Sequence, residues 1–122
     1  MAEAEAACGR ANHAAFDDAE RLGYWDHPLS ATEQADYYRG RSSQVEVLAT
    51  ELRALTPSDF GHDWTATVAL LDSYAQWAAD NVSTIEATSS TVSEQSPGSL
   101  QSFRSAFETG RGNVCQDLFD MN

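Results

Sequence analysis

The strongest constraint on the fold is a run of large, mostly apolar side chains at helical spacing in the middle of the chain. Side chains three and four positions apart lie on one face of an α-helix. The run therefore predicts a long helix that buries one face, with Trp64 and Leu71 in the core. Apart from one step of seven, its members alternate between those two spacings: Phe60, Trp64, Thr67, Leu71, Tyr74, Ala78 and Ile85.

Three other stretches carry helical spacing, and turn residues separate them. Ser30 and Glu33 match a capping box at the start of the second helix. At the start of the third, Thr56 is a suitable cap, and Pro57 and Asp59 suit the first turn. No alternating pattern of useful length predicts a strand. We expect helices over residues 3–22, 31–55, 57–92 and 98–119.

The connections between these helices are short, which favours antiparallel neighbours. A chain of 122 residues is long enough for one domain with its own core. We therefore predict an all-α protein with a single domain over residues 1–122. Its expected architecture is an up-down-up-down antiparallel four-helix bundle.

The two cysteines, Cys8 and Cys115, lie near opposite ends of the sequence. In a bundle with an even number of antiparallel helices, the first helix starts and the last helix ends at the same end. Packed helix axes are about 8–10 Å apart, and a disulfide needs Cα atoms about 4.4–6.8 Å apart. We expect a Cys8–Cys115 disulfide that closes the bundle, with two unrelated buried thiols as the alternative. Two thiols without a nearby histidine do not make a structural zinc site.

A disulfide indicates an oxidising compartment, so we expect an extracytoplasmic protein, secreted or in the cell envelope. The opening segment MAEAEAAC has neither the basic start nor the apolar core of a signal peptide. If the disulfide forms, we expect this sequence to be a mature segment to which Met1 was added. If it does not form, we expect a cytosolic protein. No uncharged run approaches the roughly 20 apolar residues that cross a bilayer.

The net charge limits the classes of partner. Nineteen acidic residues oppose seven arginines, there is no lysine, and the formal net charge is −12. Nucleic-acid binding needs clustered basic side chains, and an anionic membrane surface also repels this charge. We expect no nucleic-acid partner, no membrane span and a monomer.

The segment LATELRALTPSDFGHDWTATVALLDSYAQW combines a Leu-rich helix, a proline-containing turn and a helix that starts at a tryptophan, between the two cysteines. This combination resembles small extracytoplasmic helical domains of actinobacterial lipoproteins and secreted proteins, most of them uncharacterised. The resemblance covers about a quarter of the chain. It implies an exported, disulfide-closed bundle and assigns no catalytic residue.

Two groups of polar side chains have both a functional and a plainer interpretation. His13, Asp17 and Glu20 share one stripe of the first helix and could bind a metal, but a solvated polar face has the same spacing, and we favour it. His62 beside Asp63 could act as a general base. A helix cap or an exposed pair fits these two residues better, because no nucleophile is paired with them in the sequence.

The connector between the first two helices contains Tyr24, Trp25 and His27. Most large rings of the chain should pack in the core, but these residues could also line a ligand pocket. Arg41 occupies a seam position of the second helix where an apolar residue is expected. We expect its stem to pack and its charged head to reach water, with ligand binding as the alternative.

The sequence contains no phosphate loop, nucleophile elbow, haem-attachment motif or zinc-protease motif. We therefore disfavour an enzyme and expect no cofactor. The leading hypothesis is an exported, non-enzymatic helical module that binds a protein or cell-envelope partner. The alternative is a small-ligand or metal-binding domain that uses the aromatic connector and the acidic/His stripe. An enzyme with dispersed carboxylates is a third, less favoured hypothesis.

Overall fold

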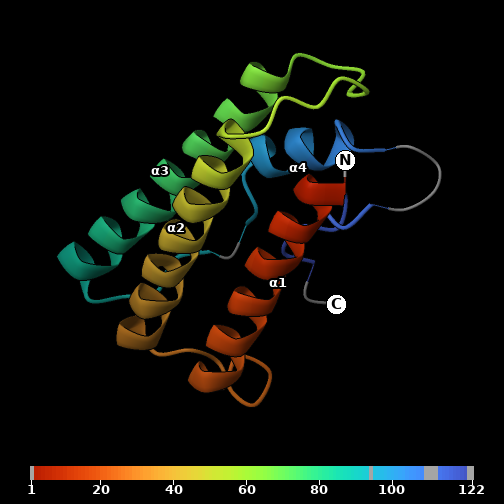
Figure 1. Cartoon of the computed structure of the whole chain (residues 1–122). Helices are drawn as coiled ribbons and strands as arrows, with labels where there is room; N and C mark the ends of the chain where they lie inside the picture. Colours follow the sequence, from red (N-terminus) through yellow and green to blue (C-terminus); the bar gives the residue numbers. More distant parts are fainter. Residues whose placement is uncertain (1, 94, 109–112, 121–122) are drawn as a thin grey trace.

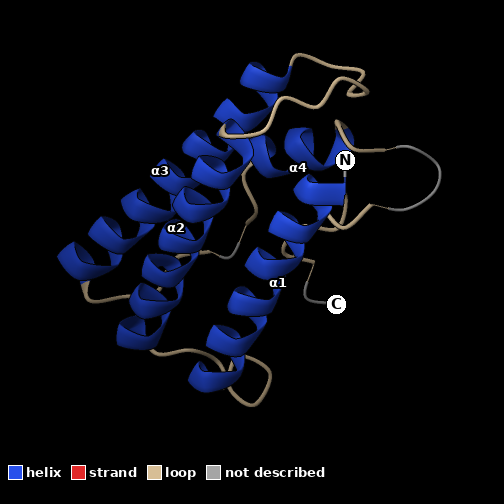
Figure 2. Cartoon of the chain, viewed as in Figure 1, coloured by secondary structure: helices blue, strands red, loops and turns tan. Residues whose placement is uncertain are grey.

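The computed structural model describes residues 2–93, 95–108 and 113–120. These residues form helices and loops with no strand (Figure 2), which confirms the predicted all-α class. The helices of the described chain are α1 (Ala2–Leu22), α2 (Ala31–Arg53), α3 (Trp64–Thr88) and α4 (Gly98–Ser105). None of them has both the length and the apolar character needed to cross a membrane.

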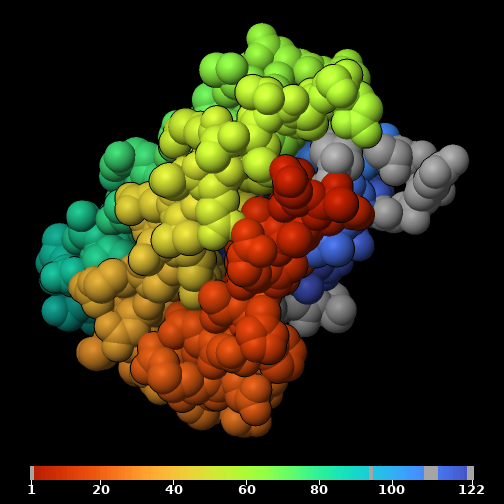
Figure 3. Space-filling model, in the orientation of Figure 1, coloured from red at the N-terminus to blue at the C-terminus, as the bar shows by residue number. Residues whose placement is uncertain are grey.

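The three long helices run antiparallel, with α2 packed against both α1 and α3 (Figure 1). The short α4 packs against α3. The last described segment, residues 113–120, returns to the start of α1, and in the space-filling view it emerges from behind that helix (Figure 3). The structure is thus a helical bundle, as predicted, in which the last described segment lies beside the first helix.

The first two helices begin and end within two residues of the predicted positions. The capping box before α2 is confirmed, because the Ser30 hydroxyl accepts a hydrogen bond from Glu33 N at 3.2 Å. In return, Ser30 N donates to the Glu33 carboxylate at 3.0 Å. This hydrogen bond lowers the pKa of the Glu33 carboxyl below its ordinary value. The sequence signal at this helix start is therefore a real local interaction.

The predicted start of the third helix at Thr56, Pro57 and Asp59 is wrong. These residues belong to a loop, and α3 begins at Trp64 because the Asp63 side chain caps it, accepting from Ala66 N at 3.0 Å. Phe60 lies in the same loop, yet its ring packs against Trp64 and Phe107, with centroids 4.9 and 5.1 Å apart. Phe60 therefore fits the helical spacing of the sequence although it packs against the core from a loop.

The other end of α3 also differs from the prediction. The helix stops at Thr88 because Ser89 adopts the left-handed conformation, with φ 53°. A right-handed helix cannot continue through a residue in that conformation. The predicted end at residue 92 is therefore wrong. Residues 89–93 form a loop that Gln34 holds against α2, since its amide exchanges two hydrogen bonds with the Val92 backbone at 2.7 and 2.9 Å.

The predicted fourth helix, over residues 98–119, is wrong beyond Ser105. Residues 113–120 form successive turns with hydrogen bonds between positions three apart, such as Gln116 N to Asn113 O at 2.9 Å. Phe119 has φ 60°, which is incompatible with a continuing α-helix. Residues 109–112, with Gly110 and Gly112, lie outside the described residues.

The core forms where the helices face one another. Alanines supply most of the buried face of α1, so α2 can approach it closely. Leu71 is fully buried, as predicted, whereas Trp64 is partly buried against the core and donates its indole N–H to Leu52 O at 3.0 Å. The largest fully buried side chains include Leu48, Leu52, Leu71, Phe103 and Phe107.

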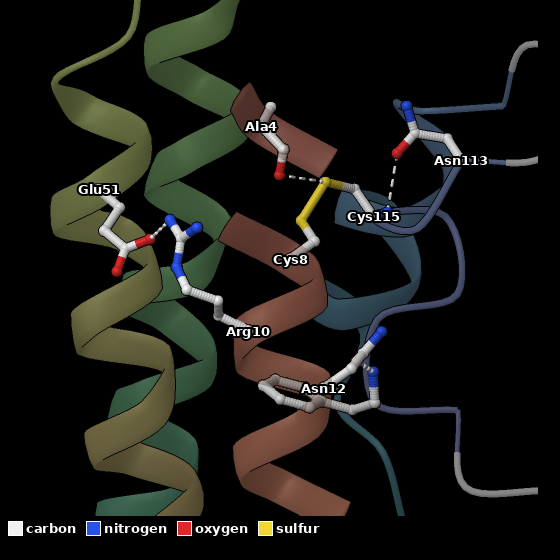
Figure 4. Close-up of a disulfide and its surroundings, with 8 residues drawn as sticks. Ala4, Cys8, Arg10, Asn12, Glu51, Asn113 and Cys115 are labelled. Carbon is white, nitrogen blue, oxygen red and sulfur yellow. Dashed lines mark hydrogen bonds and ion pairs between the residues drawn. A yellow bond between two sulfur atoms is a disulfide. The ribbon is translucent and has the colours of Figure 1, made fainter. Parts of the chain in front are cut away.

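The predicted disulfide is present between Cys8 and Cys115, whose Cα atoms are 5.2 Å apart (Figure 4). Both side chains are fully buried. Cys115 lies in the turn segment and not on a helix, and its N–H donates to the Asn113 side chain at 2.8 Å. Its Sγ atom lies 3.4 Å from the carbonyl oxygen of Ala4. The bond therefore joins α1 to residues 113–120.

Leu71→Ala should lower the free energy of unfolding by about 2–5 kcal/mol, because it removes a fully buried side chain and leaves a cavity. Urea unfolding measures this change. Leu70→Ala on the same helix is the matched control, since Leu70 is only partly buried, and it should cost less. A cost below about 1 kcal/mol at Leu71, or equal costs at both positions, contradicts the described packing of α3.

Reduction of the disulfide should lower the melting temperature by many degrees. The bond closes a loop with a sequence separation of 107, which contributes about 4–5 kcal/mol in the chain-entropy model, and each kcal/mol shifts the melting temperature by several degrees. Calorimetry of oxidised and reduced protein measures the shift. Intact-mass measurement after alkylation should find no free thiol in the oxidised sample, and two alkylated cysteines would show that the bond does not form.

Candidate functional site

A pocket of about 210 Å³ lies where α2, α3, α4 and the C-terminal segment meet the connector after α1. We call it the Arg41 pocket, after the arginine in its wall. The connector contributes Tyr24, and the segment before α4 contributes Gln95 and Ser96. Several distant parts of the sequence therefore build one site.

Arg41 is buried in this wall, with only 4% of its surface exposed. Its Nη1 donates to the Tyr74 hydroxyl at 3.2 Å and its Nη2 to the Tyr37 hydroxyl at 2.9 Å. Its guanidinium carbon lies 4.3 Å from the centre of the Phe119 ring and 5.0 Å from that of Tyr37, within the range of cation–π attraction. The expectation that its head reaches water is wrong, because these rings and hydroxyls surround it.

Arg41 differs from the exposed arginines of the described chain in its charge environment. Arg10, Arg39 and Arg53 each form an ion pair with a carboxylate, and so does Arg21. Among the described residues, no carboxylate oxygen lies within 4.0 Å of the Arg41 nitrogens. A buried charge without an opposite charge is costly, so this arrangement is unusual for a purely structural arginine.

A second arginine, Arg104 of α4, also lines the pocket. Its Nε donates to the carbonyl oxygen of Leu118 at 2.7 Å, and its Nη2 contacts the same oxygen. Arg104 therefore fixes the C-terminal segment next to the pocket and brings a second positive charge there. Asp120, at the end of that segment, contributes a carboxylate to the lining.

Aromatic rings contact one another without interruption from the connector to the C-terminal segment. Adjacent ring centroids along this path are 5.3 to 5.7 Å apart, a range in which aromatic pairs attract. The path fixes the positions of the hydroxyl groups that face Arg41. Its members, in order, are Tyr24, Tyr37, Tyr38, Trp77, Tyr74 and Phe119.

The structure brings together two of the four ligand-binding candidates, Tyr24 and Arg41. Trp25 and His27 line a neighbouring depression instead, which Tyr24 also borders. The His27 ring makes a hydrogen bond at 2.9 Å between its Nδ1 and Pro28 O. Trp25 is 46% exposed, and its ring centroid lies 4.9 Å from that of Phe16 on α1.

The metal candidates of α1 lie on its solvent-exposed face. His13 Nε2 is 3.3 Å from an Asp17 carboxylate oxygen, and Glu20 is exposed as well. Within the described residues, no three or more His, Cys, Asp or Glu side chains are grouped so that they could hold a metal ion. Their geometry is that of a solvated helix face.

His62 and Asp63 match the cap interpretation, since Asp63 is the N-cap of α3. The exposed His62 ring packs beside Phe60, with centroids 5.8 Å apart. The sequence did not predict the contributions of Arg104 and Phe119 to the pocket. One signal was available, because an arginine at an apolar seam position needs neighbours that can accept its hydrogen bonds.

Comparison of the chain with protein-family models, with curated proteins and with solved structures finds no match in any of the three. Its function has to be inferred from the chemistry of the site alone.

Proposed function

We propose that this chain is a non-enzymatic binding module that takes a small ligand in the Arg41 pocket. The observation that carries the proposal is the buried guanidinium of Arg41, which has no described carboxylate partner and borders a cavity. Ligand sites typically combine apolar and aromatic walls with a few polar groups at fixed positions. The Arg41 pocket has aromatic side chains in its walls, but most of its exposed lining is polar. We therefore favour a polar small ligand over the partner-binding hypothesis.

We also propose that the module works outside the cytoplasm. The buried Cys8–Cys115 disulfide supports an oxidising compartment. We further propose that the module belongs with the exported helical domains of actinobacteria.

A second candidate function is the binding of a protein or cell-envelope partner, and one observation favours it. Phe16 and Trp25 are 49% and 46% exposed and contact each other on the surface. Aromatic side chains are enriched at protein interfaces, where they dominate the binding energy. This pair lies outside the lining of the Arg41 pocket, so the two candidates can be tested separately.

A thermal-shift screen against a chemically diverse set of small metabolites tests the first candidate. A ligand present at about 100 times its dissociation constant stabilises the folded state by about 2.7 kcal/mol, which raises the melting temperature by several degrees or more. We expect such a hit with the wild-type protein. Ser96→Trp should abolish the shift, because Ser96 lines the pocket and the larger ring fills it.

Ser90→Trp is the matched control, because Ser90 is exposed in the loop after α3 and outside the lining of the Arg41 pocket. It should keep the shift. A screen without hits, or hits that Ser96→Trp leaves unchanged, contradicts ligand binding in this pocket. A partner captured by the wild type and lost in Phe16→Ser/Trp25→Ser would then favour the second candidate.

A further inference from the structure

We infer that the ligand of the Arg41 pocket is a small organic acid with one carboxylate group, and that this group binds the guanidinium of Arg41. The inference rests on the proposed function and adds the chemical class of the ligand. Four features of the pocket lead to it: Arg41 donors for which the described chain offers no carboxylate, an available hydroxyl proton, the balance of charges and the size of the cavity.

The first feature is the set of donors that Arg41 presents. It donates to the hydroxyls of Tyr37 and Tyr74, and a guanidinium group carries more N–H donors than these two acceptors can take. Within the described chain no carboxylate oxygen is close enough to pair with the rest. A planar carboxylate matches the planar fork of an arginine and accepts two parallel hydrogen bonds from it.

The second feature is the orientation of the Tyr74 hydroxyl. Its oxygen accepts a hydrogen bond from Arg41 Nη1 at 3.2 Å, so its own proton points away from the guanidinium. Tyr74 is itself buried, and the pocket lies beside it. The hydroxyl is therefore placed to donate to an oxygen of a ligand that Arg41 holds.

The third feature is the charge balance of the lining. Arg41 and Arg104 bring two positive charges, and Asp120 brings one negative charge, which leaves one positive charge. Asp120 is exposed, so water screens its charge more than that of the buried Arg41. One carboxylate neutralises the site, whereas a doubly charged phosphate exceeds its single net positive charge. The net charge of −12 also repels a dianion more strongly than a monoanion.

The fourth feature is the size and polarity of the cavity. Its volume is about 210 Å³, and an engineered cavity of roughly 150 Å³ holds one benzene molecule. The ligand is therefore a single ring or a short chain. The amide of Gln95 and the hydroxyl of Ser96 add hydrogen-bonding groups to the lining, which favours an acid that also carries a hydroxyl group.

Matched pairs of acids and amides test the ligand class by isothermal titration calorimetry on the oxidised protein. The probes are 4-hydroxybenzoate with 4-hydroxybenzamide, and lactate with lactamide, because each pair has the same shape and differs in charge. We expect at least one acid to bind about tenfold or more tightly than its amide. Inorganic phosphate should bind more weakly than that acid.

The decisive variant is Arg41→Met, which keeps much of the side-chain volume and removes the charge. It should abolish the preference for the acid while the ligand-free melting temperature stays the same or rises, because it removes a buried charge that has no carboxylate partner in the described chain. Arg39→Met is the matched control on the same helix. Arg39 is exposed and paired with Asp36 and Glu86, so its loss should leave acid binding unchanged.

Each other result overturns the inference. Amides that bind as tightly as their acids would refute the carboxylate and leave the proposed ligand-binding function standing. Tighter binding of phosphate, or no binding of any probe beside a positive metabolite screen, would refute the ligand class. A large fall in the melting temperature of Arg41→Met, with acid binding retained, would assign Arg41 a structural role.

Discussion

The disulfide between Cys8 and Cys115 holds the part of the fold that helix packing secures least. The backbone hydrogen bonds among residues 113–120 are those of turns, and a short turn structure of this kind is marginal without tertiary contacts. Two further interactions help to hold the segment: Phe119 N donates to the Asn12 side chain at 2.7 Å, and Arg104 binds Leu118 O. Through these contacts Leu118 and Phe119 become core residues.

The same segment completes the Arg41 pocket, so the closure of the fold and the candidate site depend on each other. Phe119 follows the bonded Cys115 by four positions and places its ring 4.3 Å from the Arg41 guanidinium. That ring covers one side of the buried guanidinium. The free energy that the disulfide and the core contribute offsets the cost of keeping Arg41 in the wall. Binding sites commonly contain residues that lower the free energy of unfolding in this way.

Local signals in the sequence predicted the parts of the fold that local interactions determine. The capping box at Ser30 and Glu33 set the start of α2, and the apolar spacing around Leu71 set the buried face of α3. The pairing of Cys8 with Cys115 was predicted correctly, although Cys115 reaches α1 from a turn segment and not from the end of a fourth helix. Phe60 misled the prediction, because a loop residue that packs in the core continues a helical spacing by coincidence.

The candidate site could be predicted only in part, for a similar reason. Tyr24 and Arg41 were identified one by one, but their common pocket depends on Phe119 and Arg104, which distant contacts bring to them. The burial of Arg41 depends on rings from α2, α3 and the C-terminal segment. The pattern of one helix contains no information about those neighbours, so it predicted a solvated head.

Amide hydrogen exchange of the oxidised and the reduced protein, below the melting temperature of both, tests most directly whether the disulfide holds the wall of the pocket. We expect reduction to increase exchange strongly over residues 113–120, including Phe119 N, which donates to Asn12. The facing parts of α2 and α3 should keep their protection, because the packing of these two helices does not involve the bond. Equal protection of residues 113–120 in both states would contradict the account.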